Sequence, residues 1–299
     1  MTTQAQEQEL VQRKPKGNLW RALVRFGSNP LSVLGLSIIL LVVLAAIFAP
    51  FIAPSPEDGR GDAVHFGQTF RAPSSKHLLG TDEVGRDLLS RILFGARLSL
   101  MLGVVVLSLA VVVGVPLGLI AGYFGGVAET VIMRVTDVFL ALPPVVLALV
   151  VTAAFERSLI NSMIAISIAW WPWYARLAYG EASSIKQEDF VQAAESQGAS
   201  RFYIMLREIL PNMTSPLLVK ISLDMGYAIL TGAILGFLGL GAQSPTPEWG
   251  TIVSSGRQYL PNMWWISTFS GLAIFITVLG FNLLGDGLRD FFDVESEGR

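Results

Sequence analysis

Residues 190–211 read FVQAAESQGASRFYIMLREILP, a polar and charged stretch with long apolar runs on both sides. Ala193, Ala194 and Ala199 within it are strong helix formers with little bulk. Gly198 interrupts these alanines, and Pro211 ends the pattern because proline cannot donate a backbone hydrogen bond. The stretch is therefore predicted to form two short helices with a bend, in water between membrane-embedded segments.

The composition of the chain is that of a membrane protein. Of its 299 residues, 52% are hydrophobic and only 15% are charged, and the apolar residues are clustered in long runs. The absence of cysteine excludes disulfides and thiolate metal sites, and two histidines are too few for a histidine-based metal centre. A net charge of -2 without a basic stripe gives no support to nucleic-acid binding.

Six apolar runs are predicted to span the membrane. They cover residues 31–52, 98–124, 135–155, 159–174, 213–238 and 263–284. Basic residues before the first run are predicted to hold the amino terminus in the cytoplasm, the alternative being a solvated tail; they are Arg13, Lys14, Lys16, Arg21 and Arg25. Six spans then place both termini and residues 190–211 on the cytoplasmic side.

The predicted fold is an all-α polytopic membrane protein divided by these spans. Residues 1–30 form a cytoplasmic tail, residues 31–53 the first transmembrane helix, and residues 54–97 an extracytoplasmic loop. Leu88, Leu89, Ile92 and Leu93 at helical spacing suggest an amphipathic helix on the membrane surface within this loop, although a plain loop also fits. Residues 98–290 form a five-helix core with a cytoplasmic loop at 181–211, and residues 291–299 form a second cytoplasmic tail.

Small and aromatic residues in the spans suggest how the helices pack. Two sets of glycines four apart allow another helix to approach closely; they are Gly114, Gly118 and Gly122, then Gly232 and Gly236. The cluster WWPWY at 170–174 is predicted to lie at the membrane–water interface, where tryptophan and tyrosine are enriched. The alternative is that these rings line a route for apolar substrate side chains.

Polar side chains inside the spans are candidate functional groups. Arg134 and Asp137 share a helix face near a membrane boundary and are expected to form a structural ion pair. Lys220 can pair with Asp224, which lies roughly 20 Å into its helix and thus deep in the bilayer. Asp224 is therefore either a lining residue of a translocation path or a buried polar tie. Asn282 is expected to make an interhelical hydrogen bond, the alternative being a gate contact.

The stretch at 190–211 resembles the cytoplasmic "EAA" loop in the membrane subunits of binding-protein-dependent ABC importers. The resemblance is carried by Ala193-Ala194, Gly198 and Leu210-Pro211. The sequence departs from the family pattern at Gln192, where Glu is frequent, and at Glu208, where the broad pattern has Ile. In that family the loop is the coupling helix that docks into a groove on the ATPase subunit.

Three further stretches resemble the peptide/nickel branch of these importers, the OppC and DppC type. They are GTDEVGRDLLSR at 80–91, MRVTDVFLALPP at 133–144 and LGFLGLGAQSPTPEWG at 235–250. The resemblance covers about residues 30–293 and implies a C-type permease subunit. Its fold would be a MetI-like core preceded by one extra helix.

The resemblance implies half of the translocation path of an ATP-driven importer of di- and oligopeptides in the bacterial inner membrane. Nickel, opine-like conjugates and modified peptides are alternative substrates. The implied partners are a B-type permease homologue, two ATPase subunits that bind ATP and Mg, and an extracytoplasmic substrate-binding protein. The residues implied to contact the ATPase are Gln192, Ala193, Ala194, Glu195, Gly198, Ala199, Ser200, Arg201, Phe202, Tyr203, Leu210 and Pro211. Asp224 and Asn282 are the candidate path residues.

The sequence carries no motif for catalysis. No GxxxxGK[ST] run occurs, so the chain cannot bind ATP in the P-loop manner, and HExxH, nucleophile-elbow and EF-hand patterns are also missing. The chain is predicted to be a non-catalytic subunit without a cofactor or metal of its own. Two other classes stay open: an ion-coupled secondary transporter, for which Asp224 is the one good coupling candidate, and a structural membrane subunit.

Overall fold

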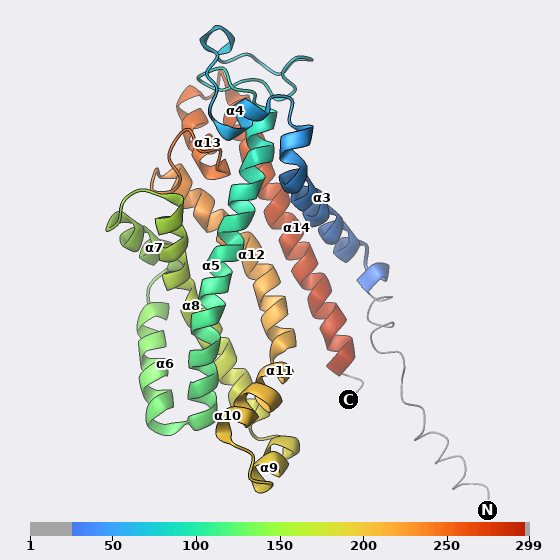
Figure 1. Ribbon diagram of the computed structural model, residues 1–299, viewed down its shortest axis with the longest axis vertical. Coiled ribbons are helices and arrows are strands. Elements are labelled where there is room, and N and C mark those ends of the chain that lie inside the picture. Colours follow the sequence, from blue (N-terminus) through green and yellow to red (C-terminus); the bar gives the residue numbers. More distant parts are fainter. Residues whose placement is uncertain (1–25, 297–299) are drawn as a thin grey trace, which may run out of the picture.

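A computed structural model of the chain describes residues 26–296. The basic run at 13–25 therefore lies outside the described residues. Within them the chain is helical and contains no strand, although Thr81 and Asp87 form an isolated β-bridge. Figure 1 shows long helices side by side along the long axis of the molecule, with short helices and loops at both ends.

Four of the described helices are long and apolar enough to cross a membrane. They are α3 (Pro30–Ile52), α5 (Leu88–Phe124), α12 (Thr214–Phe237) and α14 (Trp264–Ser296). α6 (Gly126–Leu140) and α7 (Pro144–Ala153) together qualify as a fifth span, bent by 85°. α8 (Leu159–Ile185) does not meet the same criterion but lies along α5, so the arrangement is compatible with six spans.

Short helices occupy the two ends of the bundle (Figure 1). One end, called here the hinge end, carries α9 (Asp189–Ser196), α10 (Arg201–Tyr203), the π-helical turn η2 (Ile204–Ile209) and α11 (Leu210–Asn212). The opposite end, called here the cap end, carries α4 (Pro56–Arg60), η1 (Phe66–Gln68), α13 (Trp249–Gly256) and η3 (Arg257–Tyr259). The start of α3 and the end of α14 both point toward the hinge end (Figure 1).

α5 and α8 pack closely because glycines replace side chains along their contact. A Cβ atom at Gly114 would lie 2.4 Å from the carbonyl oxygen of Trp171, and one at Gly118 would lie 2.2 Å from that of Ala175. The third contact repeats the pattern, since a Cβ at Gly122 would lie 2.7 Å from the oxygen of Tyr179. The predicted stripe is confirmed, and the matching residue order shows that the two helices run parallel.

α3 lies against α14 in the antiparallel sense. A Cβ atom at Gly35 would lie 2.6 Å from the backbone nitrogen of Leu284, and one at Gly280 would lie 2.7 Å from the side chain of Ile38. Near the hinge end, Asn29 Nδ2 donates to Asp290 Oδ2 at 3.2 Å. The extra amino-terminal helix is thus held to the last helix of the chain along much of its length.

At the cap end, α13 is packed onto α5 and α12. Trp249 Nε1 donates to Ile92 O at 2.9 Å. Glu248 caps α13 by accepting from the N–H groups of Gly250 and Thr251, both at 2.8 Å. Burial raises the pKa of the Glu248 carboxyl, and these hydrogen bonds oppose the rise. A Cβ at Gly236 would lie 2.5 Å from Glu248 Oε2, so the predicted glycine contact of α12 is confirmed here.

Two predicted segments have different structures. Residues 135–155 are not one continuous helix, because Pro143 has an extended backbone before Pro144 and separates α6 from α7. Residues 88–97 are not a separate surface helix. They form the first turns of α5, in which Leu88, Arg91 and Phe94 are buried against the rest of the cap end.

Two predicted side-chain positions also differ. The aromatic cluster at 170–174 lies inside α8 rather than at the end of a helix, with Trp170 and Tyr174 buried. Its place at the membrane–water interface stays a prediction. Asp137 pairs with Arg176 of α8 and not with Arg134. The sequence spacing allowed a pair within one helix, but the packing of α6 against α8 supplied a different cation.

The α5–α8 contact predicts a strong effect of Gly118→Leu. The new side chain would collide with the backbone of α8, so the free energy of unfolding should fall by about 1–3 kcal/mol or more. Gly180→Leu is the matched control, because a Cβ there meets no atom within 4 Å. Thermal unfolding of the purified chain in detergent measures both variants; equal stability of the two would contradict the packing argument.

Candidate functional site

The hinge segment, residues 189–213, folds as the sequence predicts around Gly198. Gly198 has a φ of +82° and ends α9. The N–H of Gly198 donates to Glu195 O at 3.0 Å, and the N–H of Ala199 donates to Ala194 O at 3.1 Å. These two bonds make a Schellman motif, in which glycine supplies the left-handed residue. Ser200 then caps α10 by accepting from the Tyr203 N–H at 3.3 Å.

Pro211 does not end the helical chain, contrary to the sequence prediction. η2 is a wide π-helical turn in which the N–H of Leu210 reaches Met205 O, five residues back. Pro211 follows directly, and α11 then leads into α12 through Met213. Because a π turn shifts the hydrogen-bond register, it accommodates a residue that has no N–H. The hinge segment and α12 are therefore connected by nearly continuous helix.

Large apolar side chains are exposed on the hinge segment. Phe202 is 67% exposed and Tyr203 is 49% exposed. Phe190 and Leu206 are also exposed, while Val191 and Ile204 are buried against the bundle. Beside them a pocket of about 520 Å³ is lined by Ile185, Glu188, Phe190, Glu208 and Asn212. A knob of aromatic side chains beside a hollow is typical of a surface that binds another protein.

The hinge segment is anchored to the end of α5. The Tyr123 hydroxyl donates to Glu195 Oε1 at 3.2 Å. The guanidinium of Arg201 lies 5.8 Å from the ring centre of Phe124, and the Lys186 ammonium lies 5.4 Å from that of Tyr123. The middle of the segment is thereby held on α5 through Glu195 and Arg201, and its carboxyl end continues into α12. A displacement of the knob must move at least one of these helices.

A polar cluster lies between α8 and α12, in the interior of the bundle. The predicted pair is confirmed, with Lys220 Nζ at 2.9 Å from Asp224 Oδ1. The Lys220 ammonium also lies 5.8 and 5.9 Å from the ring centres of Trp173 and Tyr174. Asp224 is 5% exposed, and its Oδ2 has no hydrogen-bond partner among the described residues; the same holds for the Tyr174 hydroxyl.

The exposed side of this cluster indicates which way it faces. The side chain of Lys220 is 31% exposed, and Trp173 and Tyr227 are also open to the surface of the chain. A charged side chain is costly against lipid, so this face is expected to contact water or protein. The open side of the cluster is therefore expected to face water or another protein chain rather than lipid.

Asn282 does not join this cluster. Its side-chain nitrogen donates to Val278 O at 3.0 Å, within its own helix α14. No hydrogen bond connects Asn282 to Asp224 in the described part of the chain. Among the described residues Asn282 makes no interhelical hydrogen bond, because one of its amide N–H groups donates to the carbonyl one turn earlier in α14.

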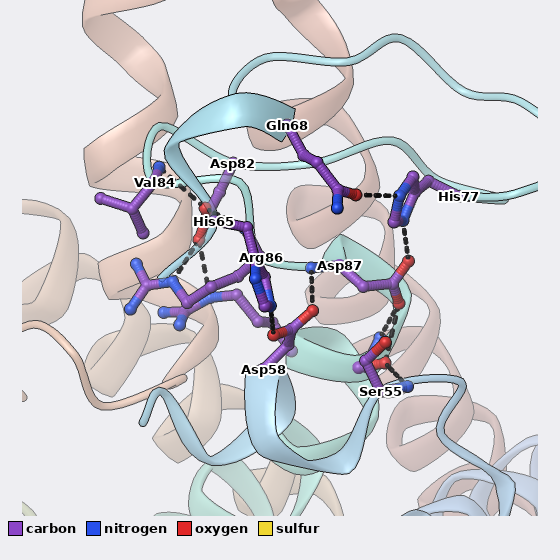
Figure 2. Close-up of polar contacts among 11 residues, drawn as sticks. Ser55, Asp58, His65, Gln68, His77, Asp82, Val84, Arg86 and Asp87 are labelled. Atoms are coloured by element: carbon purple, nitrogen blue, oxygen red, sulfur yellow. Dashed lines mark hydrogen bonds and ion pairs between the residues drawn. The ribbon is translucent and has the colours of Figure 1, made fainter. Parts of the chain in front are cut away.

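The cap end holds a polar network that the sequence did not predict. Figure 2 shows Asp58, Asp87, His65 and His77 joined by hydrogen bonds. His65 Nε2 lies 2.9 Å from Asp58 Oδ1, and His77 Nδ1 lies 3.1 Å from Asp87 Oδ1. Asp58 Oδ2 accepts from the Asp87 N–H at 2.9 Å, which links the two pairs.

A buried ion pair lies in the same region. Arg86 Nε donates to Asp82 Oδ2 at 2.7 Å, and both side chains are less than 5% exposed. The signal was present in GTDEVGRDLLSR, where the two acidic residues at 82–83 lie between Gly80 and Gly85, both at positive φ, and Arg86 follows directly. Among the described residues, no group of three or more His, Asp or Glu side chains has an arrangement that holds a metal ion.

Two family descriptions match the chain. Residues 114–295 match the family described as binding-protein-dependent transport system inner membrane component. Residues 18–73 match the N-terminal TM domain of oligopeptide transport permease C. The second match includes α3, and the first includes the hinge segment and the Lys220–Asp224 pair.

Named relatives and a solved structure agree with these matches. The probable D,D-dipeptide transport system permease protein DdpC of Escherichia coli (strain K12) is 45% identical, over 91% of this chain and 90% of that protein. The dipeptide transport system permease protein DppC of Alkalihalophilus pseudofirmus is 42% identical, over 92% and 89%. The inward-facing MetNI methionine ABC transporter contains a chain with a TM-score of 0.54 and 19% identity, which covers 69% of this chain and 96% of that one. This last likeness concerns the fold alone.

The Lys220–Asp224 pair predicts unequal costs for single and double replacement. Lys220→Met leaves a buried carboxylate without its cation and should lower the free energy of unfolding by roughly 1–3 kcal/mol. The loss is limited to this range because solvent screens the partly exposed Lys220. Lys220→Met with Asp224→Leu removes both charges and should cost less than the single change. Unfolding in detergent measures both; a double variant less stable than Lys220→Met would contradict this.

Proposed function

Since the chain belongs to the family of binding-protein-dependent transport system inner membrane components, we propose that it is the permease subunit of an ATP-driven importer of di- and oligopeptides. The proposed substrate class follows the names of the relatives, and nickel or opine-like substrates are the alternatives. The MetI-like fold and the apolar helices make the chain a multi-pass membrane protein. We propose that the chain lies in the bacterial inner membrane, with both termini and the hinge end in the cytoplasm.

The observation that carries this proposal is the mechanical connection of the hinge segment. The exposed knob formed by Phe202 and Tyr203 is joined through η2 and α11 to α12, which holds Lys220 and Asp224. Closure of an ATPase dimer would displace the knob, and nearly continuous helix would carry the displacement to α12. The remaining proposed contacts are Gln192, Ala193, Ala194, Glu195, Gly198, Ala199, Ser200, Arg201, Leu210 and Pro211.

The partners and cofactors follow from the same proposal. Two ATPase subunits would bind ATP and Mg and receive the hinge segment. A B-type permease homologue would complete the path on the open side of Lys220 and Trp173, because a charged face cannot remain against lipid. An extracytoplasmic binding protein would deliver the substrate at the cap end. Asp224 is kept as a path residue, and Asn282 is the weaker candidate because its amide is satisfied within α14.

An ion-coupled carrier is the competing class. It would use Asp224 as a coupling carboxylate, but Lys220 already balances that charge at 2.9 Å. Such a carrier also gives no role to the exposed aromatic knob. Uptake that continues when ATP is depleted would favour the carrier over the importer.

Gly198→Leu tests the role of the hinge segment. The positive φ makes any side chain there strained by about 1–2 kcal/mol, but no atom lies within 4 Å of the new Cβ, so the chain should still fold. Peptide uptake should fall at least tenfold while ATP hydrolysis continues, because the bend that orients the knob is altered.

Gly239→Leu is the matched control for this variant. Gly239 also has positive φ, +75°, and open space, but it lies at the cap end. Both variants should have the same stability, and only Gly198→Leu should uncouple hydrolysis from uptake. Uptake at the wild-type rate in Gly198→Leu would refute the coupling role.

Co-purification tests the proposed assembly. The tagged chain, extracted in mild detergent from its native host, should carry two P-loop ATPase subunits and a second permease, and the complex should hydrolyse ATP. Isolation of the chain alone at native expression levels would contradict the importer assignment.

A further inference from the structure

A pocket at the cap end lies where α5 meets the segment 245–247. Its volume is about 300 Å³, and its walls include Arg60, Phe94, Arg97 and Leu98. Two arginines thus face one hollow together with an aromatic and an aliphatic side chain. Nothing in the proposed transport mechanism uses this pocket, and its interpretation is independent of the transported substrate.

Arg97 is held in place by the turn of α3 that contains Pro50. Pro50 lies inside α3 and has no N–H, so the carbonyl of Ala46, four residues earlier, loses its helical donor. Arg97 Nε donates to this carbonyl, and its Nη2 donates to Ile47 O at 2.8 Å. The guanidinium also lies 5.7 Å from the ring centre of Phe94. Arg97 is fixed in position, but no carboxylate balances its charge among the described residues.

Arg60 supplies a second positive charge that is free to bind a ligand. It lies in the last turn of α4 and is exposed, and within residues 26–296 it forms no hydrogen bond or ion pair. Two unbalanced guanidinium groups around one pocket favour a ligand with several anionic oxygens. Arginine binds phosphate well because its N–H groups fit two oxygens at once.

The surroundings of the pocket indicate where such a ligand would come from. Arg97 contacts α3 at Ala46 and Ile47, near the end of that helix at Ile52 and therefore close to a membrane boundary. Toward the middle of the bundle the neighbouring surface is apolar, with Ile47 55% exposed and Met101 44% exposed. A phosphate at Arg60 and Arg97 would thus be attached to chains that lie along α3 and α5.

We propose that this pocket binds the phosphate of an anionic phospholipid from the membrane leaflet at the cap end. The two arginines hold the headgroup, and Phe94 and Leu98 contact the glycerol and upper acyl region. Arginine side chains bind the phosphate of a headgroup well because each guanidinium can donate to two oxygens at once. Because Arg97 also satisfies the turn of α3 that contains Pro50, the lipid would stabilise the junction between the extra helix and the core.

The test is lipid binding to the assembled importer, delipidated in detergent and followed by native mass spectrometry. The probes are palmitoyl-oleoyl phosphatidylglycerol, the diacylglycerol with the same chains, and inorganic phosphate alone. The wild type should bind phosphatidylglycerol at least about tenfold more tightly than diacylglycerol, since hydrogen bonds to the charged phosphate are lost in the latter.

Arg60→Gln is the informative variant, because the Arg60 side chain forms no hydrogen bond or ion pair within residues 26–296 and its replacement should not disturb folding. It should weaken phosphatidylglycerol binding about tenfold, whereas Arg60→Lys should keep part of it. Lys76→Gln is the matched control, since Lys76 is an exposed cation of the same cap outside the pocket. Arg97 is left unchanged because its replacement would also disturb α3.

Three results would overturn the proposal. The first is equal phosphatidylglycerol binding by Arg60→Gln and Lys76→Gln. The second is displacement of the lipid by an equal concentration of inorganic phosphate, which would make the ligand a free anion. The third is no binding to the wild-type assembly, which would mean that a partner subunit covers the pocket.

Discussion

The contact between α5 and α8 is the constraint on which the rest of the structure depends. Three glycines of α5 lie directly against carbonyl oxygens of α8, so backbone packs on backbone and a side chain of any size would separate the helices. In lipid, where apolar side chains gain little by leaving their solvent, such close packing is a main source of helix association. α5 thereby becomes the fixed element of the bundle, and its two ends hold the two functional regions.

At the hinge end, α5 anchors a segment that exposes large apolar side chains. Tyr123 and Phe124 hold Glu195 and Arg201, while the other side of the segment continues into α12. The Schellman motif at Gly198 gives a sharp turn without loss of backbone hydrogen bonds, and the π turn carries the helix through Pro211. The segment combines an exposed apolar knob with stiff connections, which is what transmission of force from a partner requires.

At the cap end, α5 begins inside a compact polar structure. Asp58, Asp82, Asp87, Arg86 and Arg91 are all buried there, and most of their polar atoms are paired. Such a network has few alternative arrangements, because each unpaired charge would be costly. The cap therefore fixes the start of α5, and Arg97 connects it to the end of α3.

The sequence alone was enough to predict most of the long helices and several local features of this protein. Long uncharged runs are unstable in water, so they predict membrane-spanning helices directly. The observed bounds of α3 and α12 agree with the predicted ones within one residue at each end. Glycines four apart, the Lys220–Asp224 spacing and the bend at Gly198 were also correct, because each is a local property of helix geometry.

Only the tertiary structure decided the partners of polar groups that meet across helices. Asp137 pairs with Arg176 of α8 rather than with Arg134, because helix packing and not sequence spacing brings those charges together. The same holds for the charges in residues 80–91, which look like those of a surface helix until α4 and the loop at 245–247 enclose them. The sequence sets which groups must be satisfied, whereas the packing of distant segments decides which groups satisfy them.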